Sequence, residues 1–264
     1  MATVVGDGPP AALLIHGAWQ GAWVWDALAA RLRAAGTLVM APDLPGNGID
    51  ATPPEAVSLR LYVDFLSSLL ENLPVKTALI AHSGGGVIAS QLAEAHADRV
   101  SGIAYLAGMM LPSGTGFRTL TDELLPSHPE AAGIGPHLIW SADRLTSTVP
   151  PDAARTIFFH DLPPEDAQRA ARRLTPQPEG GRAVTATLTA ERFGRLPRLY
   201  IEALHDRSIV LPAQRRMQAL VPGARVVSMP TGHAPHIAAP DLVAAHLLSW
   251  LVSCRMRSTT GDPT

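Results

Sequence analysis

The chain has 264 residues, 47% of them hydrophobic and 17% charged, which is enough apolar material to bury one large core. Its formal net charge of -2 gives no electrostatic reason to expect nucleic acid or an anionic membrane as a partner. The only cysteine, Cys254, excludes a framework of disulfides within the chain and a cysteine metal site.

Strand and helix patterns alternate through the first 109 residues. Apolar runs predict strands and amphipathic spacing predicts helices, in the order strand 11–15, helix 24–34, strand 37–41, helix 60–73, strand 77–81, a helix after Ser83 and strand 102–107. This alternation is typical of a mostly parallel sheet with helices on both faces. The sequence therefore predicts an α/β fold with a doubly wound sheet.

The alternation stops at residue 110 and returns near residue 192. The segment between is rich in proline and predicts short helices, such as one over 163–174 that begins Pro-Pro-Glu-Asp. Strands are predicted again at 198–204 and 225–229, and a final helix at 240–252. We interpret residues 1–109 and 192–254 as one core, 110–191 as a helical cap (lid) inserted into it, and 255–264 as a flexible tail.

Polar residues follow four of the predicted strands. In open α/β sheets, sites form beyond the carboxyl ends of the strands, so these distant stretches are expected to converge. They are His16-Gly17-Ala18, His82-Ser83-Gly84, His205-Asp206 and Gly232-His233.

Ser83 lies in a turn that resembles a nucleophile elbow. The pattern G-x-S-x-G places a serine on a strained strand-to-helix turn, where the flanking positions must be almost free of side chains. Here the stretch is Ala81-His82-Ser83-Gly84-Gly85, with alanine replacing the first glycine. A serine in a glycine-rich turn is by itself more often only a turn, but its place between strand and helix favours a nucleophile.

A serine nucleophile needs a histidine base and a carboxylate that orients it, in the chain order Ser, Asp, His on this fold. Asp206 and His233 follow the last two predicted strands in that order. Each alone would be an ordinary loop residue, so their joint position carries the interpretation. His236 remains an alternative base.

Other polar residues near these positions have structural interpretations. We expect His82 and His205 to point away from their neighbours Ser83 and Asp206. Asp43, in the stretch PDLPG, is expected to serve as a turn and capping residue.

The tetrahedral intermediate of acyl transfer also needs main-chain donors for its oxyanion. One is expected from the residue after the nucleophile, Gly84, and one from the loop after the first strand, for which we choose Ala18. His16 and Gly17 are expected to shape that loop.

Several stretches together resemble the α/β-hydrolase superfamily, in particular its methylesterase and hydroxynitrile lyase branch with bacterial esterase relatives. They are HGAWQGAWVWDAL, APDLPGNG, AHSGGG, ERFGRLPRLYIEALHDRSIV and GHAPHIAAPDLV, and the similarity spans about residues 11–252. The resemblance implies a Ser83, Asp206 and His233 triad, oxyanion donors at Ala18 and Gly84, and small carboxylic esters as substrates. Lyases of this branch carry lysine where this chain has Ala234, and threonine at Gly17, so the departures favour ester hydrolysis.

We therefore expect a serine hydrolase that acts on a small-molecule ester without metal or cofactor. Trp19 and Trp140 are the candidate substrate-binding residues, although buried aromatic rings more often belong to the core. Two alternatives stay open: a tailoring enzyme of secondary metabolism that uses the same triad for lactonisation, cyclisation or other non-hydrolytic chemistry, and a ligand-binding protein with an idle triad. The first residues lack the pattern of a signal peptide and no apolar run reaches the roughly 18 residues of a membrane span, so we expect a cytoplasmic monomer or homodimer without membrane or nucleic-acid partners.

Overall fold

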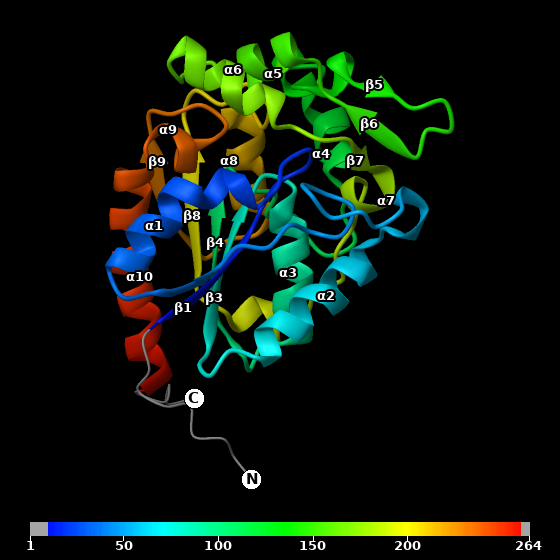
Figure 1. The fold of residues 1–264 in the computed structure, drawn as a ribbon. Helices are drawn as coiled ribbons and strands as arrows, with labels where there is room; N and C mark the ends of the chain where they lie inside the picture. The colour runs from blue at the N-terminus through cyan, green and yellow to red at the C-terminus, as the bar shows by residue number, and fades with distance from the viewer. Residues whose placement is uncertain (1–9, 260–264) are drawn as a thin grey trace.

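The computed structural model of the chain describes residues 10–259, with side chains described up to residue 254. Its centre is a six-stranded sheet in the order β2-β1-β3-β4-β8-β9, in which all neighbouring strands are parallel (Figure 1). The strands are β1 (Ala11–Ile15), β2 (Leu38–Met40), β3 (Thr77–His82), β4 (Val100–Leu106), β8 (Arg198–Ala203) and β9 (Ala224–Met229). The predicted parallel sheet is confirmed, with strand ends within two residues of the expected ones.

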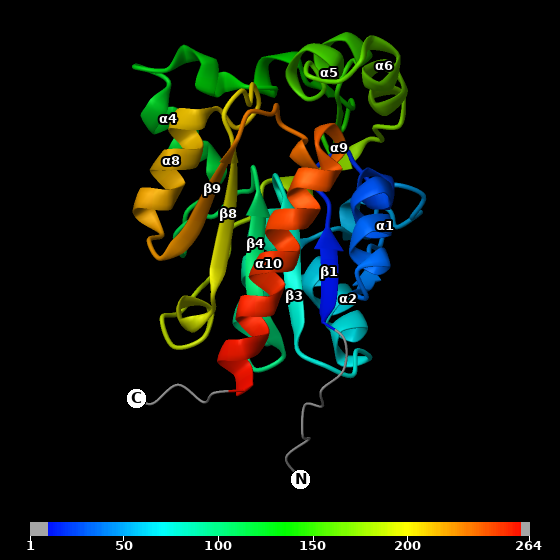
Figure 2. The ribbon, with the colours of Figure 1, turned by 90° about the vertical axis from the view of Figure 1, so that its left-hand side faces the viewer.

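Helices cover both faces of the sheet. On one face lie α1 (Asp26–Ala34), preceded by the 3₁₀ turn η1 (Ala22–Trp25), and α10 (Pro240–Thr259), which crosses the sheet in front in Figure 2. On the other face lie α2 (Leu59–Glu71) and α3 (Gly85–Ala95). Helix α8 (Leu211–Leu220), which the sequence pattern did not indicate, connects β8 to β9 and shares an apolar cluster with α3.

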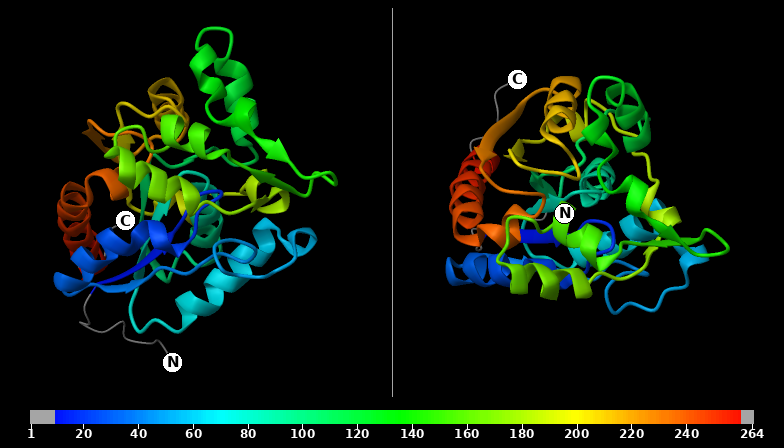
Figure 3. Two further views of the ribbon diagram at one scale, coloured as in Figure 1. Left: turned by 45° about the horizontal axis from the view of Figure 1, so that its top comes forward. Right: turned by 90° about the horizontal axis from the view of Figure 1, so that it is seen from above.

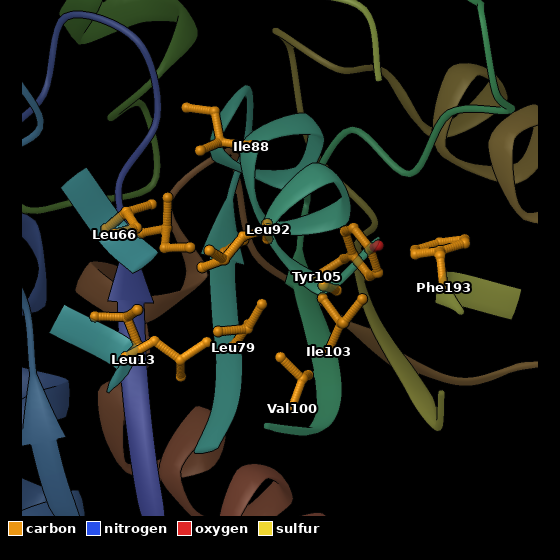
Figure 4. Packing of buried hydrophobic residues seen from close by; sticks show 14 of the residues in the cluster. Leu13, Leu66, Leu79, Ile88, Leu92, Val100, Ile103, Tyr105 and Phe193 are labelled. Atoms are coloured by element: carbon orange, nitrogen blue, oxygen red, sulfur yellow. The ribbon is translucent and has the colours of Figure 1, made fainter. Parts of the chain in front are cut away.

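The alternation of side chains along β1 explains why the sheet has two cores. Leu13 and Ile15 face α2 and α3, whereas Ala12 and Leu14 face α1 and α10, because successive strand residues point to opposite faces. Figure 4 shows the first cluster, where Leu66 of α2 and Leu92 of α3 pack over Leu79 of β3. Both faces of the central strands are therefore covered by helices and shielded from water, so a functional site can form only at the strand ends.

A long insertion, residues 107–197, connects β4 to β8 and includes the predicted cap segment. Its helices α5 and α6 and its small antiparallel sheet β5-β6-β7 lie above the carboxyl ends of the central strands (Figures 1 and 3). Its elements are α4 (Phe117–Leu124), η3 (Pro129–Ala132), η4 (Gly135–His137), β5 (Ile139–Trp140), β6 (Thr146–Thr148), α5 (Pro151–Ile157), α6 (Pro164–Arg172), β7 (Gln177–Pro178), α7 (Glu179–Arg182) and η5 (Phe193–Arg195). Below we call residues 107–197 the β4–β8 insertion.

The last helix is longer than the sequence indicated. Helix α10 continues to Thr259 rather than ending at Val252, because no glycine or proline interrupts the chain before Gly261. Residues 260–264 of the predicted tail lie outside the described residues.

Another short 3₁₀ turn, η2 (Pro54–Ala56), precedes α2. Within residues 10–259, no helix combines the length and the apolar character that crossing a membrane requires.

Candidate active site

Ser83 sits on a sharp turn between β3 and α3. Its φ of 52° lies in the left-handed region, which costs a non-glycine residue about 1–3 kcal/mol unless neighbours hold it. Its carbonyl oxygen accepts hydrogen bonds from the N–H groups of Gly86 at 3.0 Å and Met109 at 2.9 Å. A Cβ on Gly85 would lie 2.6 Å from the carbonyl oxygens of both Ile15 and His16. The glycine therefore lets α3 begin directly against the end of β1, with Ser83 at the rim.

The structure brings Ser83, His233 and Asp206 into one hydrogen-bonded chain. His233 Nε2 lies 3.1 Å from Ser83 Oγ, and His233 Nδ1 lies 2.8 Å from Asp206 Oδ2. The second carboxylate oxygen, Asp206 Oδ1, accepts from the N–H groups of Ser208 at 2.7 Å and Ile209 at 3.0 Å. These contacts fix the orientation of the carboxylate and of the imidazole that faces the serine.

Two residues between α5 and α6 support the loops that carry Asp206 and His233. Asp161 Oδ2 accepts from the N–H of Gly232 at 2.5 Å, and His160 Nε2 donates to the carbonyl oxygen of His205 at 2.9 Å. A Cβ on Gly232 would approach Asp161 Oδ1 to 2.7 Å, so this close approach requires glycine. His205 is exposed, in line with the expectation that it points away from Asp206.

The main chain of Ala18 lies near Gly84, the residue after Ser83. Outside the chain neighbours of Gly84 and its own helix, the nearest atom to a Cβ built on Gly84 would be Ala18 N, at 4.0 Å. Neither the Ala18 N–H nor the Gly84 N–H donates a hydrogen bond to any residue that the structure describes. His16 shapes the loop as expected, because its Nδ1 donates to the Gly17 carbonyl oxygen at 2.8 Å and its Nε2 accepts from Leu44 N at 3.1 Å. Burial lowers the pKa of His16, which keeps the ring neutral for this arrangement.

Trp19, directly after Ala18, is a second non-glycine residue in the left-handed region, with φ of 62°. Its N–H donates to Gln177 Oε1 at 3.0 Å, its carbonyl oxygen accepts from Thr175 N at 2.9 Å, and its Nε1 donates to the Ser147 carbonyl oxygen at 3.1 Å. All three partners belong to the β4–β8 insertion. The loop after β1 is therefore fastened to residues more than 120 positions away.

His82, which we expected to point away from Ser83, packs against His233. The two ring centres lie 4.7 Å apart. His82 Nε2 donates to the main-chain carbonyl oxygen of His233 at 2.7 Å, and Nδ1 lies 2.9 Å from Gln20 Oε1. Burial is the main cause that lowers the pKa of His82 well below its ordinary value. A histidine at the end of a wholly apolar strand was the one sequence signal of this buried contact.

His236, the alternative base, does not reach Asp206. It is fully buried, and its ring centre lies 4.4 Å from that of Trp25 and 4.5 Å from that of His82. Neither ring nitrogen has a hydrogen-bond partner among the described residues. Burial lowers its pKa to about 3, so the ring is neutral at physiological pH. The geometry thus favours His233 over His236.

A cavity of about 670 Å³ opens over Ser83. The two predicted substrate-binding residues, Trp19 and Trp140, both line it, together with Ala18 and Gly84. The carboxylate of Asp43 lies elsewhere, accepting from Ala22 N at 2.6 Å in the turn role that the sequence indicated. Phe158 stacks on His233 with ring centres 5.2 Å apart.

Charged side chains at the cavity wall pair with one another. Arg182 binds Glu179 through two hydrogen bonds of 2.6 and 2.8 Å, and Arg118 lies 3.6 Å from Asp122. Among the residues that the structure describes, no group of three or more His, Cys, Asp or Glu could hold a metal ion. These two ion pairs therefore add no net charge to the cavity wall.

Comparison with known proteins finds similarity to enzymes along most of the chain. Over 250 residues the chain is 32% identical to a pyrethroid hydrolase of Sphingobium wenxiniae, covering 88% of this chain and 84% of that protein. A pheophorbidase of Raphanus sativus is 29% identical, covering 89% and 92%. The crystal structure of a pyrethroid hydrolase from Sphingobium faniae superposes with a TM-score of 0.82 at 28% identity, covering 92% and 98%. Residues 12–246 match the profile described as the alpha/beta hydrolase family, and the chain belongs to that family.

Proposed function

We propose that the protein is a serine hydrolase that cleaves a carboxylic ester through an acyl-enzyme, with Ser83 as nucleophile. The observation that carries the proposal is the continuous chain from Ser83 Oγ to His233 at 3.1 Å and from His233 to Asp206 at 2.8 Å. A serine hydroxyl is a weak nucleophile unless such a base takes its proton.

The proposed reaction has two halves. In the first, His233 Nε2 takes the proton of Ser83 as Oγ attacks the ester carbonyl, and the same nitrogen then gives the proton to the departing alcohol. In the second, His233 activates a water molecule that hydrolyses the acyl-enzyme. Asp206 holds the imidazole with Nδ1–H toward the carboxylate, and the N–H groups of Ala18 and Gly84 bind the oxyanion in both halves.

The cavity supports an uncharged ester larger than a simple acetate. Its volume of about 670 Å³ lies well within the range of pockets that hold drug-sized ligands, and its charged side chains are already paired. Trp140 gives the wall an aromatic surface for an apolar substituent. The names of the relatives make pyrethroid esters and methyl esters, methyl jasmonate among them, the first compounds to test.

Residues 110–191 are proposed to act as the cap that closes this cavity. Much of the lining comes from this segment, including Leu125, Ile134, Trp140 and Arg182.

The loop after β1 supports ester hydrolysis over cyanohydrin cleavage. A Cβ on Gly17 would lie 2.8 Å from the Cβ of Ser83, so the threonine of the lyases does not fit here without a shift of the serine. Ala234 is fully buried where the lyases carry lysine.

The test is acyl-enzyme formation at Ser83. The wild-type protein is expected to hydrolyse p-nitrophenyl butyrate and to gain one fluorophosphonate adduct, which peptide mass spectrometry places on Ser83. Ser83→Ala is expected to lose both the ester hydrolysis and the adduct, while its far-ultraviolet circular dichroism spectrum stays that of the wild type. Wild-type turnover in Ser83→Ala would refute the nucleophile, and a wild-type protein without turnover or label would refute the hydrolase itself.

A further inference from the structure

The loop that carries Ala18 is held in place by residues of the β4–β8 insertion rather than by the core alone. This loop, residues 16–20, is called the oxyanion loop below, and the inference rests on the proposed function. We infer that Gln177 in β7 is a positioning residue that acts through Trp19 to aim the Ala18 N–H at the reacting carbonyl.

The first step of the argument is the conformation of Trp19. Its φ of 62° is one that residues other than glycine rarely adopt. Such a conformation persists only where several contacts with the surroundings hold it. The Trp19 N–H lies in the Ala18–Trp19 peptide plane, whereas the Ala18 N–H lies in the plane before it, and the two planes are joined through the φ and ψ of Ala18. Fixing the Trp19 N–H therefore restricts the directions open to the Ala18 N–H, and a relaxed Trp19 would remove that restriction.

The second step is what holds Trp19. The N–H and the indole N–H of Trp19 each donate to the insertion, to Gln177 Oε1 at 3.0 Å and to the Ser147 carbonyl oxygen at 3.1 Å, and its carbonyl oxygen accepts from Thr175 N at 2.9 Å. Both main-chain polar groups of Trp19 thus bind β7 or the residues just before it, and its indole N–H binds β6. Trp19 itself is 6% exposed, so water does not compete for these bonds.

The third step is what holds Gln177. Tyr62 OH donates to Asn47 Oδ1 at 2.7 Å, Asn47 Nδ2 donates to Gln177 Oε1 at 2.8 Å, and Gln177 Nε2 lies 3.4 Å from Tyr62 OH. This closed ring of three buried side chains fixes both ends of the Gln177 amide. A Cβ on Gly181 would lie only 2.2 Å from Tyr62 OH, so the hydroxyl is also enclosed by α7. Gln177 Oε1 is therefore a hydrogen-bond acceptor in a fixed position, because Asn47 and Tyr62 of the core hold the amide and α7 of the insertion encloses the Tyr62 hydroxyl.

The experiment compares Gln177→Met, which removes the acceptor at similar side-chain length, with Gln177→Glu, which keeps an oxygen for Trp19 N–H. With p-nitrophenyl butyrate and active sites counted by fluorophosphonate, Gln177→Met is expected to lower kcat about 10- to 100-fold with KM within about threefold, since losing an oxyanion donor outright costs about 10²- to 10³-fold. Gln177→Glu is expected to recover most of that loss. Affinity for a trifluoromethyl ketone, which forms an oxyanion on Ser83, should fall in parallel with kcat/KM.

A matched control separates positioning from general loosening. Glu94 in α3 accepts hydrogen bonds from Thr189 and Phe193 and so also fastens the insertion to the core, but it lies outside the cavity. Glu94→Gln is expected to lower the melting temperature and leave kcat per active site within twofold of wild type. If Gln177→Met does not fold, Gln177→Leu removes the same acceptor with a shorter apolar side chain and is expected to show the same loss of kcat.

The possible results separate this inference from the proposed function. An active wild type whose folded Gln177→Met or Gln177→Leu variant keeps its kcat, or raises only KM, would overturn the positioning role and leave the proposed hydrolase function intact. A wild type that neither hydrolyses esters nor takes the phosphonate label would overturn the proposed function and this inference with it.

Discussion

Replacing either of two adjacent glycines after Ser83 by alanine is expected to change the free energy of unfolding, in opposite directions at the two positions. At Gly85 an added Cβ would lie 2.6 Å from the carbonyl oxygens of Ile15 and His16, whereas real Cβ contacts essentially never fall below 3.0 Å. Both contacts are main chain, so α3 and β1 must move apart. Overpacking of this kind costs about 1–3 kcal/mol, and two backbone clashes put Gly85→Ala near 3 kcal/mol.

Gly84 is the matched control. It has a helical φ of -57° and ψ of -25°, and an added Cβ would meet nothing closer than 4.0 Å. Alanine there restricts the unfolded chain without strain, so Gly84→Ala is expected to stabilise the protein by about 0.4–1 kcal/mol.

Urea unfolding followed by tryptophan fluorescence measures both changes. The shift at Gly85 also displaces His16 and hence the oxyanion loop, so kcat/KM per active site should fall about 10-fold in Gly85→Ala, because a displacement of about 1 Å can cost 10²-fold. Equal destabilisation by the two alanines, or wild-type stability of Gly85→Ala, would refute the reasoning about how closely α3 approaches β1.

Three further predictions concern the site and its surroundings. Asp206→Asn is expected to lower kcat about 10⁴-fold in a folded protein, measured with p-nitrophenyl butyrate, because the amide no longer holds the productive imidazole tautomer; a loss below 10-fold would contradict this. Burial lowers the folded-state pKa of His236 to about 3, below its unfolded value near 6.5, so its contribution to stability is complete above pH 6.5 and is lost as the pH falls. At pH 5 that loss is about 2 kcal/mol, and urea unfolding of His236→Phe at pH 7 and pH 5 should show an acid sensitivity smaller by that amount. Trp140→Ala is expected to raise KM for bulky aromatic esters about 10-fold while the melting temperature stays within a few degrees, and a variant that only melts earlier would count against a role in binding.

The sequence could locate all six strands of the central sheet, because each contains a short apolar run, but it did not indicate α8, the helix that connects β8 to β9. The positions of Ser83, Asp206 and His233 followed from the ends of those strands. The structure brings the three side chains together, while their catalytic roles stay predictions.

The parts that sequence reasoning missed depend on contacts between distant segments. Strands β5, β6 and β7 are two or three residues long, too short for an alternating pattern to show. The hydrogen bond between Trp19 and Gln177 joins residues 158 positions apart, and nothing near either residue indicates the other. His82 gave only the signal of a polar residue at the end of an apolar strand, which names no partner.

The β4–β8 insertion touches the reacting groups from two sides. Asp161 and His160 hold the loops of His233 and Asp206, while Gln177, Thr175 and Ser147 hold the loop of Ala18. Replacing the whole insertion with that of a related hydrolase would therefore remove the supports of both the proton-transfer pair and the oxyanion donor. A chimera designed to change substrate preference must retain the side chains of His160, Asp161 and Gln177 and the main-chain path at residues 147 and 175, or it will lose turnover.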